Sequence, residues 1–184
     1  DCDQLDGARI ARTPQSNWER TPDGDDELAR CKELMCEVES LAPPKCKLVW
    51  TAGNHDSRFS ARLAQNAPEF IRVQGFDLPD HFPAWNFAWS CFVNDTLVIK
   101  HRWKGGVHSS HNNALGSGIS MATGHDHMLK VTPYVDYKGI RWGVNLGTMS
   151  DIGPDQYKFS YSEDSPANHC SGFGVFTFDK DGFL

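Results

Sequence analysis

The stretch Gly124-His125-Asp126-His127 carries the residue types best suited to chemistry in this sequence. Its two imidazoles lie two residues apart, directly after a glycine and the short apolar run 118–123. If the segment is extended, residues i and i+2 point the same way, so His125 and His127 would face one small volume while Asp126 points elsewhere. Because neutral imidazole is a common metal ligand, two that converge predict a metal site that needs further ligands. The alternative is a pair of solvated loop histidines.

Two further segments with ligand-type side chains also follow apolar runs. Residues 50–52 precede Asn54 and His55, and residues 97–99 precede His101. In α/β sheets, ligands bind outside the carboxyl ends of the strands. We therefore expect three strand ends to bring these side chains to a common site.

The spacing of apolar residues predicts the elements that would position these side chains. We expect helices over 23–41 and 57–73, the second interrupted by Pro68, and a short helix within 102–117. Strands are expected over 46–51, 87–93, 96–100, 118–123, 129–136, 140–146 and 172–178. Residues 8–22, 74–86 and 147–171 are predicted loops. This succession predicts an α/β (α+β) fold in a single domain over residues 1–184.

Composition limits the function classes. The net charge of -6 argues against a large nonspecific nucleic-acid surface. No apolar run approaches the roughly 20 residues of a membrane span, and no signal segment opens the chain, so we expect a cytoplasmic protein. The six cysteines form no CxxC pair, which argues against a zinc finger and predicts reduced, mostly buried thiols. They are Cys2, Cys31, Cys36, Cys46, Cys91 and Cys170.

Taken in order, the motifs resemble those of the calcineurin-like metallophosphoesterases. That family's motifs run Asp-x-His, Gly-Asp-x-x-Asp, Gly-Asn-His-Asp/Glu, His and Gly-His-x-His. Here Gly53-Asn54-His55-Asp56, His101 and Gly124-His125-Asp126-His127 match the last three. The opening Cys2-Asp3-Gln4-Leu5-Asp6 resembles the second motif, with cysteine where glycine is usual. Residues 143–148 resemble the strand and turn that follow, so the resemblance extends from residue 1 to near the carboxyl end.

The resemblance implies a two-sheet β-sandwich flanked by helices and a site for two divalent ions. Asp3 would bridge the ions and His127 would serve one of them. The other ion would be completed by Asn54, His101 and His125. Imidazole, amide and carboxylate ligands suit manganese, iron, zinc or nickel. Two such ions about 3.5–4 Å apart can hold a phosphate and lower the pKa of a bound water.

The implied function is metal-dependent hydrolysis of a phosphomonoester or phosphodiester. His55 would donate a proton or hydrogen bond to the leaving oxygen, and Asp56 would orient it. The substrate could be a nucleotide or nucleic acid, so a nuclease or nucleotide phosphodiesterase is included. One alternative is a non-catalytic scaffold of the same fold that binds a protein partner. Another is a protein in which zinc is purely structural.

The first family motif, Asp-x-His, has no counterpart in this sequence. One ion would keep four protein ligands, whereas the other would keep only Asp3 and His127. The first strand of the sheet would be missing too. We therefore expect a carboxyl-terminal portion of a longer protein, with weak or single-ion loading and poor activity.

The other histidines receive plainer interpretations. His108 and His111 are expected to be solvated loop residues, and His81 and His169 to be structural or surface residues. Trp103, two residues after His101, could line the site and stack on a base.

Overall fold

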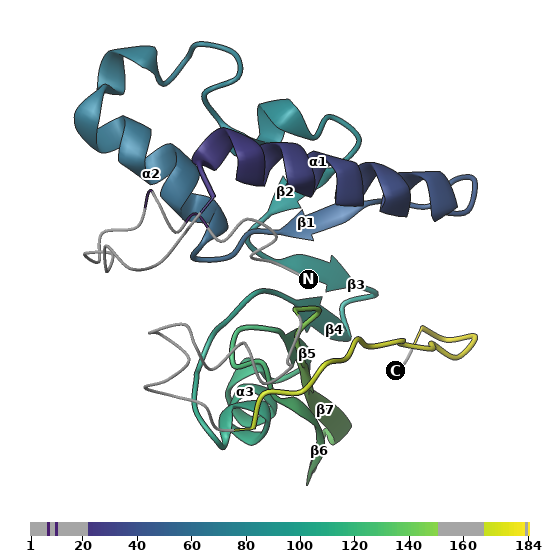
Figure 1. Ribbon diagram of the computed structural model, residues 1–184. Coiled ribbons are helices and arrows are strands. Elements are labelled where there is room, and N and C mark those ends of the chain that lie inside the picture. Colours follow the sequence, from purple (N-terminus) through teal and green to yellow (C-terminus); the bar gives the residue numbers. More distant parts are fainter. Residues whose placement is uncertain (1–6, 8–9, 11–21, 151–167, 183) are drawn as a thin grey trace. The chain divides into compact units, whose positions relative to one another are not determined.

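The computed structural model describes residues 7, 10, 22–150, 168–182 and 184 (Figure 1). These residues form a mixed α+β fold with three α-helices and two sheets, one of them five-stranded. They divide into two compact units, an amino-terminal unit within residues 2–88 and a carboxyl-terminal unit within residues 89–184. The mixed class is confirmed, while the two-sheet sandwich stays a prediction. Among the described helices, none combines the length and apolarity needed to cross a membrane.

Helix α1 (Gly24–Leu41) opens the described part of the amino-terminal unit. Its first turn contains Asp25, Asp26 and Glu27, where negative charge is favourable at a helix start. Cys31 and Met35 are buried in the core of this unit. The apolar residues Leu34, Val38 and Leu41 are 44%, 47% and 77% exposed, so only part of the helix's apolar residues is buried.

Trp50 is the centre of this core. It lies in β1 (Val49–Thr51), which pairs in parallel with β2 (Asn86–Ala88). Its side chain is 1% exposed, and its ring stacks on Phe87 with 4.8 Å between centroids. The strand predicted over 87–93 is therefore wrong as one element. Phe87 packs in the core around Trp50, whereas Cys91–Val93 forms β3 in the other unit's sheet.

Helix α2 (Asp56–Asn66) is shorter than the predicted helix over 57–73. A 3₁₀ turn, Pro68–Phe70, follows it directly. Pro68 has no amide hydrogen to continue the helical ladder, which explains the early end. A second 3₁₀ turn, Leu78–His81, contributes Leu78 to the Trp50 core.

The carboxyl-terminal unit is a five-stranded sheet in the order β3-β4-β5-β7-β6. The strands are β3 (Cys91–Val93), β4 (Leu97–Ile99), β5 (Ser120–Thr123), β6 (Leu129–Asp136) and β7 (Gly139–Leu146). The predicted hairpins are confirmed, because β3–β4 and β6–β7 pair antiparallel. Strands β4, β5 and β7 run parallel, so their carboxyl ends share one edge of the sheet.

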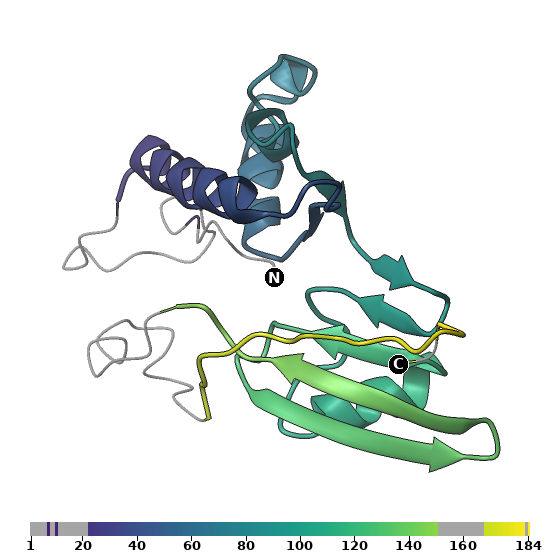
Figure 2. The same ribbon diagram turned by 90° about the vertical axis from the view of Figure 1, so that its right-hand side faces the viewer.

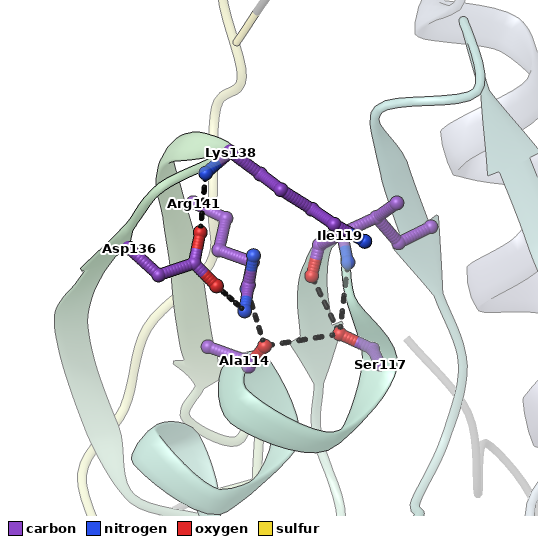
Figure 3. Close-up of polar contacts among 6 residues, drawn as sticks. All are labelled: Ala114, Ser117, Ile119, Asp136, Lys138 and Arg141. Carbon is purple, nitrogen blue, oxygen red and sulfur yellow. Dashed lines mark hydrogen bonds and ion pairs between the residues drawn. The ribbon is translucent and has the colours of Figure 1, made fainter.

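Helix α3 (Ser109–Ser117) covers one face of this sheet through polar contacts. Gly143 lies directly beneath it, because a Cβ there would overlap the backbone carbonyl of Ser110. Arg141 Nε donates to the carbonyl of Ala114 in the helix at 2.9 Å. Arg141 Nη2 also donates to Asp136 Oδ2 at 2.7 Å, which joins helix and hairpin (Figure 3).

The opposite face is apolar and carries the second core, made of Leu97, Ala122 and Val144. Phe176 and Phe178 pack against it. Figure 2 shows the carboxyl-terminal segment, in yellow, running along the sheet. The strand predicted over 172–178 is wrong, because these residues form no β-strand. The rings of Phe176 and Phe178 cover the sheet face, and the segment adds no strand to the sheet.

Candidate metal centre at the carboxyl edge of the five-stranded sheet

Two of the predicted ligands, His101 and His125, follow neighbouring parallel strands. His101 comes two residues after the end of β4, and His125 two residues after the end of β5. The carbonyl oxygen of His101 accepts hydrogen bonds from the backbone N–H groups of Gly124 and His125, at 3.0 and 3.1 Å. The side chain of His101 is 4% exposed. The backbone thus fixes both residues at the sheet edge.

The rings of these two histidines face each other. Nε2 of His101 lies 2.9 Å from Nδ1 of His125, with the ring planes at 73° and the centroids 4.8 Å apart. In the metal-free protein this contact is a hydrogen bond in which one ring donates and the other accepts. Both nitrogens could also bind one cation, since two nitrogens 2.0–2.1 Å from an ion at a right angle are about 2.9 Å apart.

His127 has a different environment from the expected one. Residues 124–127 form a turn, with the His127 N–H donating to the carbonyl of Gly124 at 3.3 Å and His127 at φ 55°. The expectation of an extended segment is therefore wrong, and the i, i+2 argument does not apply. The ring of His127 packs edge-on against His169, with centroids 4.8 Å apart. Asp126 does point elsewhere, because its Oδ1 accepts from the N–H of Gly106 at 3.2 Å.

His169 is the residue that the sequence reasoning missed. Backbone hydrogen bonds hold its neighbourhood against the loops that follow β5 and β7. Cys170 N–H donates to the carbonyl of His127, and Thr148 N–H donates to the carbonyl of Cys170, each at 2.9 Å. Gly147, at φ 76°, allows this close approach, since a Cβ there would meet the Cys170 carbonyl. No motif marks His169, because it lies 42 residues after His127 in sequence.

Asn54, His55 and Asp56 lie in the amino-terminal unit, at the turn from β1 into α2. Asp56 is 3% exposed, and its Oδ2 accepts from Trp50 Nε1 at 2.9 Å and from the Gly53 N–H at 2.8 Å. Asp56 therefore closes this turn and anchors the central tryptophan. Burial, together with the negative charges of Asp56 and Glu27, raises the pKa of the Cys31 thiol to about 11.

The predicted ligand set is only partly described. Asp3 lies outside the described residues, and Asn54 belongs to the other unit. Within the part of the chain that the structure describes, no three His, Cys, Asp or Glu side chains are grouped to hold an ion. His101 and His125 come together as one pair, and His127 pairs with His169 instead. The five-ligand, two-ion arrangement stays a prediction.

The plainer interpretations are confirmed only in part, because His111 is exposed but lies in α3, so its prediction as a loop residue is wrong. His108 is exposed, the His111 ring packs on Tyr134, and His81 Nε2 lies 2.7 Å from the Gly75 carbonyl. Trp103 is 44% exposed, and a Cβ at Gly116, near the end of α3, would touch its ring.

The expectation of mostly buried thiols is wrong for the described cysteines. Cys31 is buried, whereas Cys36 and Cys46 are exposed and Cys91 and Cys170 are intermediate. The two exposed thiols lie in the second half of α1 and in the connection to β1, and neither belongs to the Trp50 core. All five are free, as expected.

Comparisons with family models, curated proteins and solved structures found no match for this chain. Its resemblance to the metallophosphoesterases therefore rests on the sequence motifs alone and stays a prediction.

Proposed function

We propose that this chain hydrolyses a phosphomonoester or phosphodiester with the help of divalent ions bound at the carboxyl edge of the five-stranded sheet. One observation carries the proposal, namely the 2.9 Å separation between Nε2 of His101 and Nδ1 of His125. Two buried or half-buried imidazoles at the ends of neighbouring parallel strands are prepared to bind one cation with little rearrangement.

The protein's part in this chemistry is to hold and orient. The His101 carbonyl fixes the turn that presents His125, and Asp126 ties the same turn to the backbone of Gly106. When bound, divalent ions supply charge for a phosphoryl oxygen and a water of lowered pKa. Asp3, Asn54, His55, Asp56 and His127 keep, as predictions, the roles that the resemblance implies.

Hydrolysis of bis(p-nitrophenyl) phosphate and of p-nitrophenyl phosphate, each with added manganese, tests the proposal. We expect His101→Ala and His125→Ala to lower the rate by at least about a hundredfold, because each removes a ligand of the ion that activates water. His108→Ala, an exposed histidine outside the sheet edge, is the matched control and should keep full activity. Turnover that survives His125→Ala would overturn the proposal.

A partner-binding scaffold is the second candidate, and the apolar face of the β6–β7 hairpin favours it. Cross-strand pairs on this face are all apolar: Leu129↔Leu146, Val131↔Val144, Pro133↔Trp142 and Val135↔Ile140. Val131, Val135 and Ile140 are 62%, 70% and 55% exposed. Val144 itself is buried in the second core, so only the outer part of this face is exposed. Exposed apolar surface of this kind is typical of interaction sites. Metal binding without turnover of either phosphate ester would favour this second candidate.

A further inference from the structure

We infer that His169 is a metal ligand that pairs with His127 and forms a second ion position at the same sheet edge. The inference deepens the proposed function, because it adds a protein ligand to that metal centre. It assigns chemistry to a residue outside every motif recognised in the sequence.

The ring spacing and the ring tilt of the two histidine pairs are nearly identical. The ring centroids of His127 and His169 are 4.8 Å apart with the planes at 70°, against 4.8 Å and 73° for His101 and His125. An imidazole bound to an ion has its centroid about 3.2 Å from that ion, given a metal–nitrogen distance of about 2.0–2.1 Å. Two imidazoles at 90–109° on one ion therefore have centroids about 4.5–5.2 Å apart. Both pairs fall within this range.

Backbone hydrogen bonds hold the chain around His169 in place. Three hydrogen bonds link Cys170 to His127, Thr148 to Cys170, and Gly172 to Thr148, at 2.9, 2.9 and 3.0 Å. Thr148 and Ser171 form a parallel bridge. A ligand held in this way loses little conformational entropy on binding, which favours affinity.

The pairing changes the expected number of ions. The motifs alone leave the second ion with His127 and Asp3, which predicts weak or single-ion loading. With His169 added, two imidazoles are available to each ion, one pair per position. We therefore expect two ions to bind each chain.

Titration of the metal-free 184-residue chain with cobalt(II) tests the inference. Bound metal is counted by equilibrium dialysis, and the visible absorption bands report nitrogen ligation. We expect two ions per chain for the original sequence. His169→Phe keeps an aromatic ring against His127 but removes the ligand, so one ion should be lost or its affinity lowered at least about tenfold. His169→Asp, which keeps a ligating atom, should recover part of that affinity.

His108→Ala is the control and should bind two ions, and circular dichroism checks that each variant is folded. His101→Ala should lose the other ion only. If His169→Phe binds cobalt as the original sequence does while His101→Ala loses one ion, the inference is wrong and the proposed function stands. If the original sequence binds a single ion and His101→Ala removes it, the inference is likewise wrong and the proposed function stands. If neither variant changes cobalt binding, the inference and the metal site of the proposed function both fail.

Discussion

Several of the described carboxylates hold the backbone in place by accepting N–H groups. Asp126 accepts from Gly106, Asp56 from Gly53, and Asp136 from Lys138. Two of these acids lie inside the motifs that suggest chemistry. A carboxylate within a motif can thus place its neighbouring histidine through the backbone, because it fixes the turn on which that histidine lies.

The Asp136 carboxylate provides a prediction about pH. The Lys138 N–H and then the Arg141 guanidinium lower the pKa of Asp136 below its usual value. A lowered pKa means that the charged form stabilises the folded state above the unfolded pKa, near 4, and that this contribution is lost as pH falls through the folded pKa. In urea unfolding, Asp136→Asn should therefore be less stable than the original sequence at pH 6. The difference should shrink steadily toward pH 3, and a difference that is the same at both pH values would contradict the assignment.

Several specific contacts fix the position of α3 on the sheet. Gly143 in β7 lets the helix backbone approach at Ser110, and Arg141 on the same strand reaches the helix carbonyl of Ala114. Asn145, also in β7, donates through Nδ2 to Ser109 Oγ at 2.9 Å, and its Oδ1 accepts from Thr123 Oγ1 at 3.0 Å. The start of α3 is thus linked to the last residue of β5, just before the His125 turn.

Gly143→Val should therefore displace α3 and destabilise the chain by at least about 2 kcal/mol, because overpacking against a backbone cannot be relieved by a side-chain rotation. Urea unfolding followed by circular dichroism measures this. Gly24→Ala is the control, since a Cβ at Gly24 would meet nothing within 4 Å. Its stability should stay within about 0.5–1 kcal/mol of the original or rise slightly. Equal stabilities for the two variants would show that α3 does not rest on Gly143.

Much of this arrangement can be predicted from local sequence. Asn94 and Asp95 predict the β3–β4 turn, because Asn and Asp tolerate the positive φ that tight hairpin turns need, and both residues have a positive φ. The alternation along 129–136 predicts β6. The parallel neighbours of β4 and β5 follow from no local pattern, since parallel pairing joins distant residues. His169 is beyond prediction for the same reason, because backbone contacts made by Thr148 and Cys170 bring it to His127.

At the scale of the whole molecule, the apolar cores and the histidines are separate. One core surrounds Trp50, and the other contains Leu97, Ala122 and Val144. The four histidines of the sheet edge belong to neither core. Most of the stability should therefore come from apolar burial, so that bound ions add to a chain that is already folded.

Chelation separates a catalytic centre from a structural zinc site. Treatment with a chelator should abolish phosphate-ester hydrolysis while the far-ultraviolet circular dichroism at 25 °C stays unchanged, because neither core needs the ions. The melting temperature should fall by several degrees, since ions at a hundred times their Kd contribute about 2.7 kcal/mol, and each kcal/mol shifts a chain of this size by about 2–4 °C. Added manganese should restore both activity and melting temperature. Loss of the folded spectrum at 25 °C on chelation would instead make the ions part of the fold, as in structural zinc proteins.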